Sequence, residues 1–137
     1  MREVDLEGAW RVTQAALPDV RETGGAMVYI SSTPAISGYK GTPYTEAKAA
    51  VLGLMRDVAR EYGDDGVRAN ALALGNIGTE ATVEHTTHDY DELAREAALG
   101  RWGQPAEAAA AIAWFLSPMA SFVTGQTLVV DGGAVMR

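Results

Sequence analysis

Three short apolar runs, separated by stretches with helical spacing, constrain the fold of this chain most strongly. They are AMVYIS (26–31), VRANALAL (67–74) and TLVVD (127–131), with glycine or serine at their boundaries. Runs of this length and composition are typical of buried strands. Strands that alternate with helices indicate a parallel sheet covered on both faces. The sequence therefore predicts a three-layer α/β fold.

The helical stretches carry recognisable start and stop signals. Helical spacing over 4–22 predicts a helix that Pro18 interrupts late and that ends at Gly24-Gly25. Thr42-Pro43 places a capping hydroxyl before a proline, which predicts a helix start. That helix is expected to run to about residue 63. Two further helices are expected near 89–99 and 105–117. Loops are expected over 32–42 and over 75–88, the second polar and mobile.

Polar or glycine-rich positions follow each predicted strand. Ser31 and Ser32 end the first strand, Gly75 follows the second, and Asp131 closes the third. In open parallel sheets, ligands bind beyond the carboxyl ends of the strands. We therefore expect these three points to converge at one edge of the sheet. Asp131-Gly132-Gly133 is expected to form a structural turn there.

A tyrosine and a lysine lie one helical turn apart within this region. Tyr44 and Lys48 are separated by four positions, so they share one face of the helix predicted from residue 43. A lysine ammonium beside a phenol stabilises the phenolate and so lowers a pKa that is about 10 in water. A tyrosine of this kind can exchange a proton with an alcohol or carbonyl oxygen near neutral pH. The pair predicts carbonyl–alcohol chemistry.

Composition excludes several other classes of function. A formal charge of −7 argues against nucleic acid or an anionic membrane as partner. The sequence has no cysteine, which excludes a disulfide framework and thiol catalysis and fits a reducing compartment. No apolar run approaches the roughly 20 residues of a membrane span, and charges stand where a signal peptide has its apolar core. We expect a cytoplasmic protein.

Five features in order resemble the carboxyl-terminal half of short-chain dehydrogenases/reductases. They are a Leu-Pro break before Gly25, Ser-Ser after the first strand, Tyr-x-x-x-Lys, VRANALALGNIGT, and the closing segments RWGQPAE and FVTGQTLVVDGG. Tyr-x-x-x-Lys alone is a weak signal, but the ordered set is specific and covers nearly the whole chain. The resemblance implies a Rossmann-like, doubly wound parallel sheet. Residues 1–137 would be the carboxyl-terminal portion of a single such domain, lacking its amino-terminal strands.

The resemblance also implies catalytic roles. Tyr44 would be the acid/base, and Lys48 would bind the nicotinamide ribose and lower the tyrosine pKa. Ser32, the second serine of the pair, would orient the substrate oxygen. The family's usual spacing from serine to tyrosine favours Ser31 by counting, although the intervening loop can absorb a deletion. A strand turns successive side chains to opposite faces, so one of the two serines is expected to face the site.

The cofactor implied by the resemblance is NAD or NADP. Its contacts in this chain would come from Tyr44, Lys48, Gly75, Ile77 and Thr79, with Ile77 using its backbone to place the carboxamide. The glycine-rich turn that cradles the pyrophosphate in this family does not occur in the sequence, nor do the strands that bind adenosine. The residues that would discriminate NAD from NADP belong to that absent part.

Two positions depart from the family pattern. Leu74-Gly75 stands where the family usually has Pro-Gly, so the turn keeps its glycine but loses a fixed φ. Asp5 aligns with a catalytic asparagine of many members. An aspartate cannot donate the amide hydrogen bonds and would add negative charge near the lysine.

Three functions remain open from the sequence. The first is an NAD(P)-dependent oxidoreductase that interconverts a small ketone and a secondary alcohol, similar to 3-oxoacyl reductases. The second is a truncated, non-catalytic remnant that keeps its oligomerisation helices but binds no dinucleotide. The third is an epimerase or dehydratase, because relatives reuse the Tyr/Lys pair. His85 and His88 lie three apart without a third ligand nearby in sequence, so a metal site is not expected.

A homo-oligomer is expected from the same resemblance, through the helices over 4–22 and 43–63. Small residues on the second helix, which permit close helix approach, would contact the second copy, unless they face their own sheet; they are Ala47, Ala49, Ala50 and Gly53. The first strand is expected to leave one sheet edge unpaired.

Overall fold

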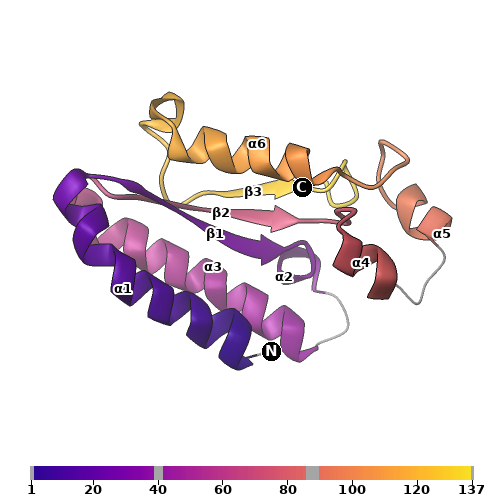
Figure 1. The fold of residues 1–137 in the computed structure, drawn as a ribbon, viewed down its shortest axis with the longest axis horizontal. Helices are drawn as coiled ribbons and strands as arrows, with labels where there is room; N and C mark the ends of the chain where they lie inside the picture. Colours follow the sequence, from indigo (N-terminus) through magenta and orange to yellow (C-terminus); the bar gives the residue numbers. More distant parts are fainter. Residues whose placement is uncertain (1, 39–41, 86–89, 137) are drawn as a thin grey trace.

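The computed structural model describes residues 2–38, 42–85 and 90–136 and contains one sheet of three parallel strands in the order β1-β2-β3 (Figure 1). The strands are β1 (Ala26–Ser32), β2 (Arg68–Leu74) and β3 (Thr127–Val130). Leu74 aligns with Ser32 on one side and with Val130 on the other. The carboxyl ends of the strands therefore lie together, as predicted.

Helices cover both faces of this sheet (Figure 1). On one face lie α1 (Gly8–Thr23) and α3 (Pro43–Glu61), and on the other lies α6 (Pro105–Leu116). The predicted three-layer α/β fold is confirmed, and its topology is Rossmann-like. Among the described residues β1 pairs with β2 alone, so its other edge is unpaired, as expected.

Both faces of β2 are buried because the strand has a hydrophobic core on each side. Ala69 and Ala71 lie in the core beneath α3, whereas Leu72 belongs to the core beneath α6. This alternation follows from the two-residue period of a strand. The most buried partners are Val51, Met55, Val58 and Val67 on the first side, and Phe115 and Ala120 on the second.

The amino-terminal helix differs from its prediction at Pro18 and at its start. It passes through Pro18 without ending and continues to Thr23, so the predicted late interruption is wrong. A proline removes one helical hydrogen bond, and packing of Leu17 and Val20 against the core compensates for that loss. Before α1, the segment Arg2–Glu7 forms a π-helix, η1. The predicted end at Gly24 is confirmed, with φ +59°.

Several short helices lie where the sequence predicted loops. The helix α2 begins at Pro34 inside the predicted 32–42 loop, and α4 lies in the stretch predicted to be a mobile loop over 75–88. No helix in the described part of the chain is long and apolar enough to cross a membrane. The remaining bounds are α2 (Pro34–Ser37), η2 (Gly63–Asp65), α4 (Glu80–His85), α5 (Tyr90–Arg95) and η3 (Pro118–Ala120).

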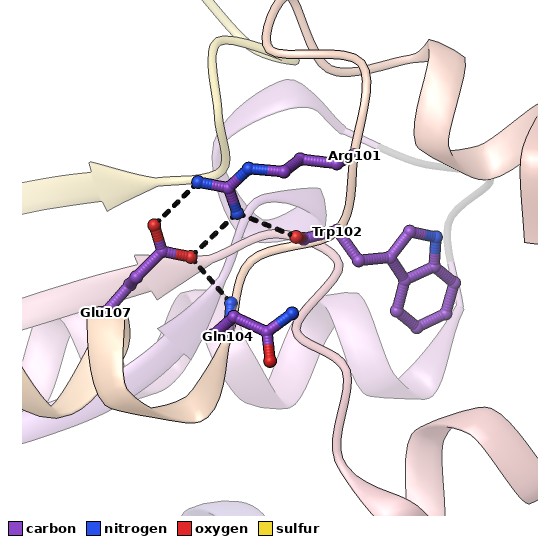
Figure 2. A network of polar contacts seen from close by, with 4 residues as sticks. All are labelled: Arg101, Trp102, Gln104 and Glu107. Atoms are coloured by element: carbon purple, nitrogen blue, oxygen red, sulfur yellow. Dashed lines mark hydrogen bonds and ion pairs between the residues drawn. The ribbon is translucent and has the colours of Figure 1, made fainter.

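A charged network holds the start of α6 (Figure 2). Arg101 donates two hydrogen bonds to the Glu107 carboxylate, of 2.7 and 2.9 Å, and a third to the carbonyl of Trp102 at 3.0 Å. Glu107 Oε2 also accepts the backbone N–H of Gln104 at 2.7 Å. The Arg101 hydrogen bond, followed by that of Gln104, lowers the pKa of Glu107 from 4.5 to about 2. The ionised carboxylate thus caps α6.

The end of β2 approaches the turn after β3 very closely. A Cβ built on Gly75 would lie 2.5 Å from the Asp131 Cβ and 2.9 Å from its Cα. Asp131 is itself fixed, because its carboxylate accepts the backbone N–H groups of Gly133 and Val135 at 2.9 and 2.7 Å. The structural turn predicted at this aspartate is confirmed, and Gly75 is the residue that lets the two segments meet.

Replacing Gly75 by alanine is expected to destabilise the fold by about 1–3 kcal/mol, because the backbone of the Asp131 turn has to move. Urea unfolding followed by circular dichroism measures the change. Gly63→Ala is the matched control, since a Cβ there meets no heavy atom of the described chain within 4 Å. Equal effects of the two substitutions would contradict the close-approach explanation.

Replacing Glu107 by glutamine is expected to lower the urea midpoint at pH 7. The folded-state pKa lies below the usual value, so the stabilisation is complete above about pH 4.5 and is lost as the pH falls towards about 2. The difference between the two proteins should therefore narrow over that window. It should also shrink in high salt, because the pair is exposed to solvent. Glu61→Gln controls for the loss of one negative charge. A difference in urea midpoint that did not change with pH would argue against the capping role of the ionised Glu107.

Candidate active site

An open pocket of about 1000 Å³ lies at the carboxyl edge of the sheet. Its walls come from the ends of β1 and β2, the start of α3, one face of α6, and the segment after β3. The convergence predicted for the three strand ends is confirmed. The pocket is lined by every residue predicted for the site, namely Ser31, Ser32, Tyr44, Lys48, Gly75, Ile77 and Thr79.

The start of α3 places Tyr44 and Lys48 in this pocket. Thr42 caps the helix, because its hydroxyl oxygen accepts the backbone N–H of Thr45 at 3.3 Å, and Pro43 occupies the first turn. Lys48 Nζ lies 5.7 Å from the centroid of the Tyr44 ring. The two side chains are therefore adjacent on one face of the helix, as the spacing predicted. Their catalytic roles stay predictions.

Two acceptors hold the Lys48 ammonium. The carbonyl oxygen of Ile30 lies 3.3 Å from Nζ, and Asp5 Oδ1 lies 3.1 Å from it. The side chains of Lys48 and Asp5 are only 14% and 20% exposed. The negative charge that the sequence placed near the lysine is therefore in direct contact with it.

The two serines at the end of β1 have different surroundings. Ser31 is 2% exposed, and its hydroxyl donates to the backbone carbonyl of Lys48 at 2.8 Å. Ser32 is half-buried, and its hydroxyl donates to the Leu74 carbonyl at the longer distance of 3.3 Å. Ser31 is thus engaged in tying strand to helix, whereas Ser32 is more accessible from the pocket. This difference supports Ser32 as the orienting serine.

The segment after β2 is held by the residues that precede α6. Ile77 forms a β-bridge with Gly103, and backbone hydrogen bonds of 2.9 Å join Gly78 N–H to the Gly103 carbonyl and Gly103 N–H to the Asn76 carbonyl. Thr79 immediately precedes α4, and its hydroxyl accepts the backbone N–H of Thr82 in that helix at 3.1 Å. Gly75, Ile77 and Thr79 therefore form a fixed wall of the pocket.

Part of the pocket wall was not predicted from sequence. The side chains concerned lie on α5, directly after α5, and on α6, and these segments approach the pocket only through tertiary packing. Trp102 is 3% exposed and stacks on Tyr90 with ring centroids 4.4 Å apart, which holds α5 in place. One sequence signal pointed to this part of the pocket. It was the RWGQPAE segment, which contains the tryptophan and the residues that cap α6. The residues missed in these segments include Leu93, Glu96, Ala108, Ala109 and Ile112.

A metal centre finds no support in the part of the chain that the structure describes. No group of three or more His, Asp or Glu residues there could hold a metal ion. Of the two histidines considered in the sequence, His88 lies outside the described residues. His85 ends α4.

Comparison with known proteins identifies relatives along nearly the whole chain. The profile of the family described as enoyl-(acyl carrier protein) reductase matches residues 1–135. The 3-oxoacyl-(acyl-carrier-protein) reductase of Thermotoga maritima is 38% identical over 97% of this chain and 55% of its own length. The L-rhamnose 1-dehydrogenase (NAD(P)(+)) of Azotobacter vinelandii is 37% identical over 94% of this chain and 52% of its own.

Solved structures agree with this relationship. A protein described as a short chain dehydrogenase/reductase family protein superposes with a TM-score of 0.88 at 36% identity, covering 97% of this chain and 55% of that protein. The 3-oxoacyl-(acyl-carrier protein) reductase of Brucella melitensis gives a TM-score of 0.85 at 33% identity, covering 97% and 51%. The chain thus spans about half the length of the relatives it matches. It belongs to the short-chain dehydrogenase/reductase family.

Proposed function

We propose that this chain forms the catalytic, nicotinamide-facing portion of an NAD(P)-dependent oxidoreductase that interconverts a ketone and a secondary alcohol. In this proposal residues 1–137 are the carboxyl-terminal portion of a single Rossmann-like domain. The observation that carries it is the pairing of Tyr44 with Lys48 on one helix face, in a pocket that Ser32 also lines. The reductases and dehydrogenases among its relatives support the same reaction class.

Each side chain has a defined task in the direction of reduction. The Tyr44 hydroxyl donates its proton to the carbonyl oxygen as that oxygen becomes an alcohol. The Ser32 hydroxyl turns away from the Leu74 carbonyl and donates its hydrogen bond to the same oxygen. The positive charge of Lys48 stabilises the phenolate left behind. When bound, the nicotinamide supplies the hydride that the carbonyl carbon receives.

The pocket residues fit the nicotinamide end of such a cofactor. Lys48 lines the pocket with an ammonium that carries three donors, which suits the hydroxyls of a ribose. Ile77 is 9% exposed, and its β-bridge to Gly103 fixes its backbone. The backbone polar groups at this position can therefore bind a carboxamide in one defined orientation. Gly75 and Thr79 complete this wall. NAD and NADP fit these contacts equally well.

The substrate in this proposal is a small carbonyl compound or alcohol, similar to the substrates of 3-oxoacyl reductases. Apolar side chains of α5 and α6 line the pocket beside the polar groups, namely Leu93, Ala108 and Ile112. A cytoplasmic setting, without nucleic acid or membrane as partner, is part of the proposal. The net charge of −7 and the absence of cysteine support it.

A homo-oligomer is also proposed, through the outer faces of α1 and α3. Trp10 and Val12 on α1 are 50% and 65% exposed, and Ala49 and Gly53 on α3 are exposed. These residues support close packing against a second copy. Ala47 has to be removed from the predicted contact set, because it is 1% exposed and packs inside its own subunit.

A second candidate function is a non-catalytic chain that keeps these helices but binds no dinucleotide. The observation that favours it is the edge of β1, which has no pairing strand among the described residues.

Titration calorimetry with NADH and NADPH separates the two candidates. The oxidoreductase proposal expects saturable binding of at least one of them to the purified, folded chain, because the nicotinamide wall is formed. A folded chain that binds neither would support the second candidate.

Replacing Tyr44 by phenylalanine is expected to reduce turnover of a ketone by about 10²–10⁴-fold, because the proton donor is lost. The unfolding midpoint should change little, since the ring remains. The control is Tyr62→Phe at the opposite end of α3, where the ring lies under the Arg21 guanidinium. Full turnover of the Tyr44 variant would refute its assigned role.

A further inference from the structure

We propose that Asp5 is the positioning residue of Lys48, and that its carboxylate fixes the ammonium so that one N–H is left for a ligand in the pocket. The use of that N–H rests on the proposed function. The fixing of the ammonium is a property of the chain itself.

The first support is the burial of the pair. Asp5 Oδ1 and Lys48 Nζ are 3.1 Å apart, with side chains only 20% and 14% exposed. The other ion pairs of the described chain are at least 39% exposed on both sides, and Arg2–Glu46 is 73% and 58% exposed. Exposed pairs contribute little because water and salt screen them. The Asp5–Lys48 pair is better shielded than the rest.

The second support is the backbone that carries Asp5. The segment Arg2–Glu7 is a π-helix, and π-helical turns occur frequently at functional sites. The same segment meets α3 again through Arg2 and Glu46, 2.7 Å apart. Two ion pairs therefore join η1 to α3, and one of them reaches the pocket lysine.

The third support is a count of donors at Lys48. An ammonium has three N–H groups and no acceptor. Asp5 and the Ile30 carbonyl accept two of them, at 3.1 and 3.3 Å. The backbone of Lys48 is held as well, because its carbonyl accepts the Ser31 hydroxyl at 2.8 Å. With the residue fixed at both ends, the third N–H has a restricted direction, and Lys48 lines the pocket.

A purely structural role for Asp5 makes a different prediction. If the pair merely tied η1 to α3, it would resemble Arg2–Glu46, and removing either carboxylate would have the same consequence. A positioning role instead affects the amine of Lys48 specifically. The reactivity of that amine therefore distinguishes the two.

The reactivity of the Lys48 amine can be measured with little interference, because the sequence has two lysines, Lys40 and Lys48. In a Lys40→Arg background, Lys48 carries the one lysine amine, and peptide mass spectrometry separates it from the amino terminus. The rate of its acylation by an N-hydroxysuccinimide ester is measured without cofactor. We expect acylation at least about tenfold slower than that of Nα-acetyl-lysine amide, because the Lys48 side chain is only 14% exposed and its amine is held against Asp5, where the ester reaches it poorly.

The variants Asp5→Asn and Glu46→Gln are then compared in the same background. Asp5→Asn should accelerate acylation by about three- to tenfold, since it keeps the shape but removes the charge. Glu46→Gln should leave the rate nearly unchanged, and Asp5→Glu should restore part of the protection. Circular dichroism checks that each variant is folded.

Acylation of the Lys40→Arg protein at the rate of the free amine would overturn the proposal, even if every Asp5 variant failed to fold. Equal acceleration by Asp5→Asn and Glu46→Gln would also overturn it. Neither outcome depends on dinucleotide binding, so failure of the proposed function remains a separate result, seen in the calorimetric titration.

Discussion

The hydrogen bond from the Ser31 hydroxyl to the Lys48 carbonyl joins the end of β1 to the helix that carries Tyr44. The bond is partly buried and Ser31 is only 2% exposed, so leaving it unmade would cost about 1–3 kcal/mol. The helix cannot slide along the sheet without breaking it. The relative position of the tyrosine, the lysine and the strand end therefore depends on this contact, together with the apolar packing of α3 on β2.

The parts of the fold that could be predicted have strong local causes. Each strand is a short apolar run, and Thr42-Pro43 supplies both the cap and the fixed φ that start α3. The edge at which ligands bind follows from parallel strand order alone. For the same reason the site residues on these elements, Ser32, Tyr44 and Gly75, were brought together as expected.

The remaining features depend on contacts between distant segments. Two ion pairs join the π-helix at Arg2–Glu7 to α3, and no local sequence pattern predicts this π-helix. The choice between Ser31 and Ser32 could not be made by counting, because it rests on which hydroxyl meets the Lys48 carbonyl. The helix through Pro18 survives because tertiary packing outweighs one lost hydrogen bond.

Within the described residues, the edge of β1 that does not face β2 is open to pairing, and it lies beside the rim of the pocket. A strand hydrogen-bonded there would lie about 4.8 Å away, and backbone groups would recognise it with little regard to its side chains. If parallel, it would bring its own terminus beside Ser32 and Lys48. A segment paired at this edge would therefore form part of the pocket wall next to the end of β1.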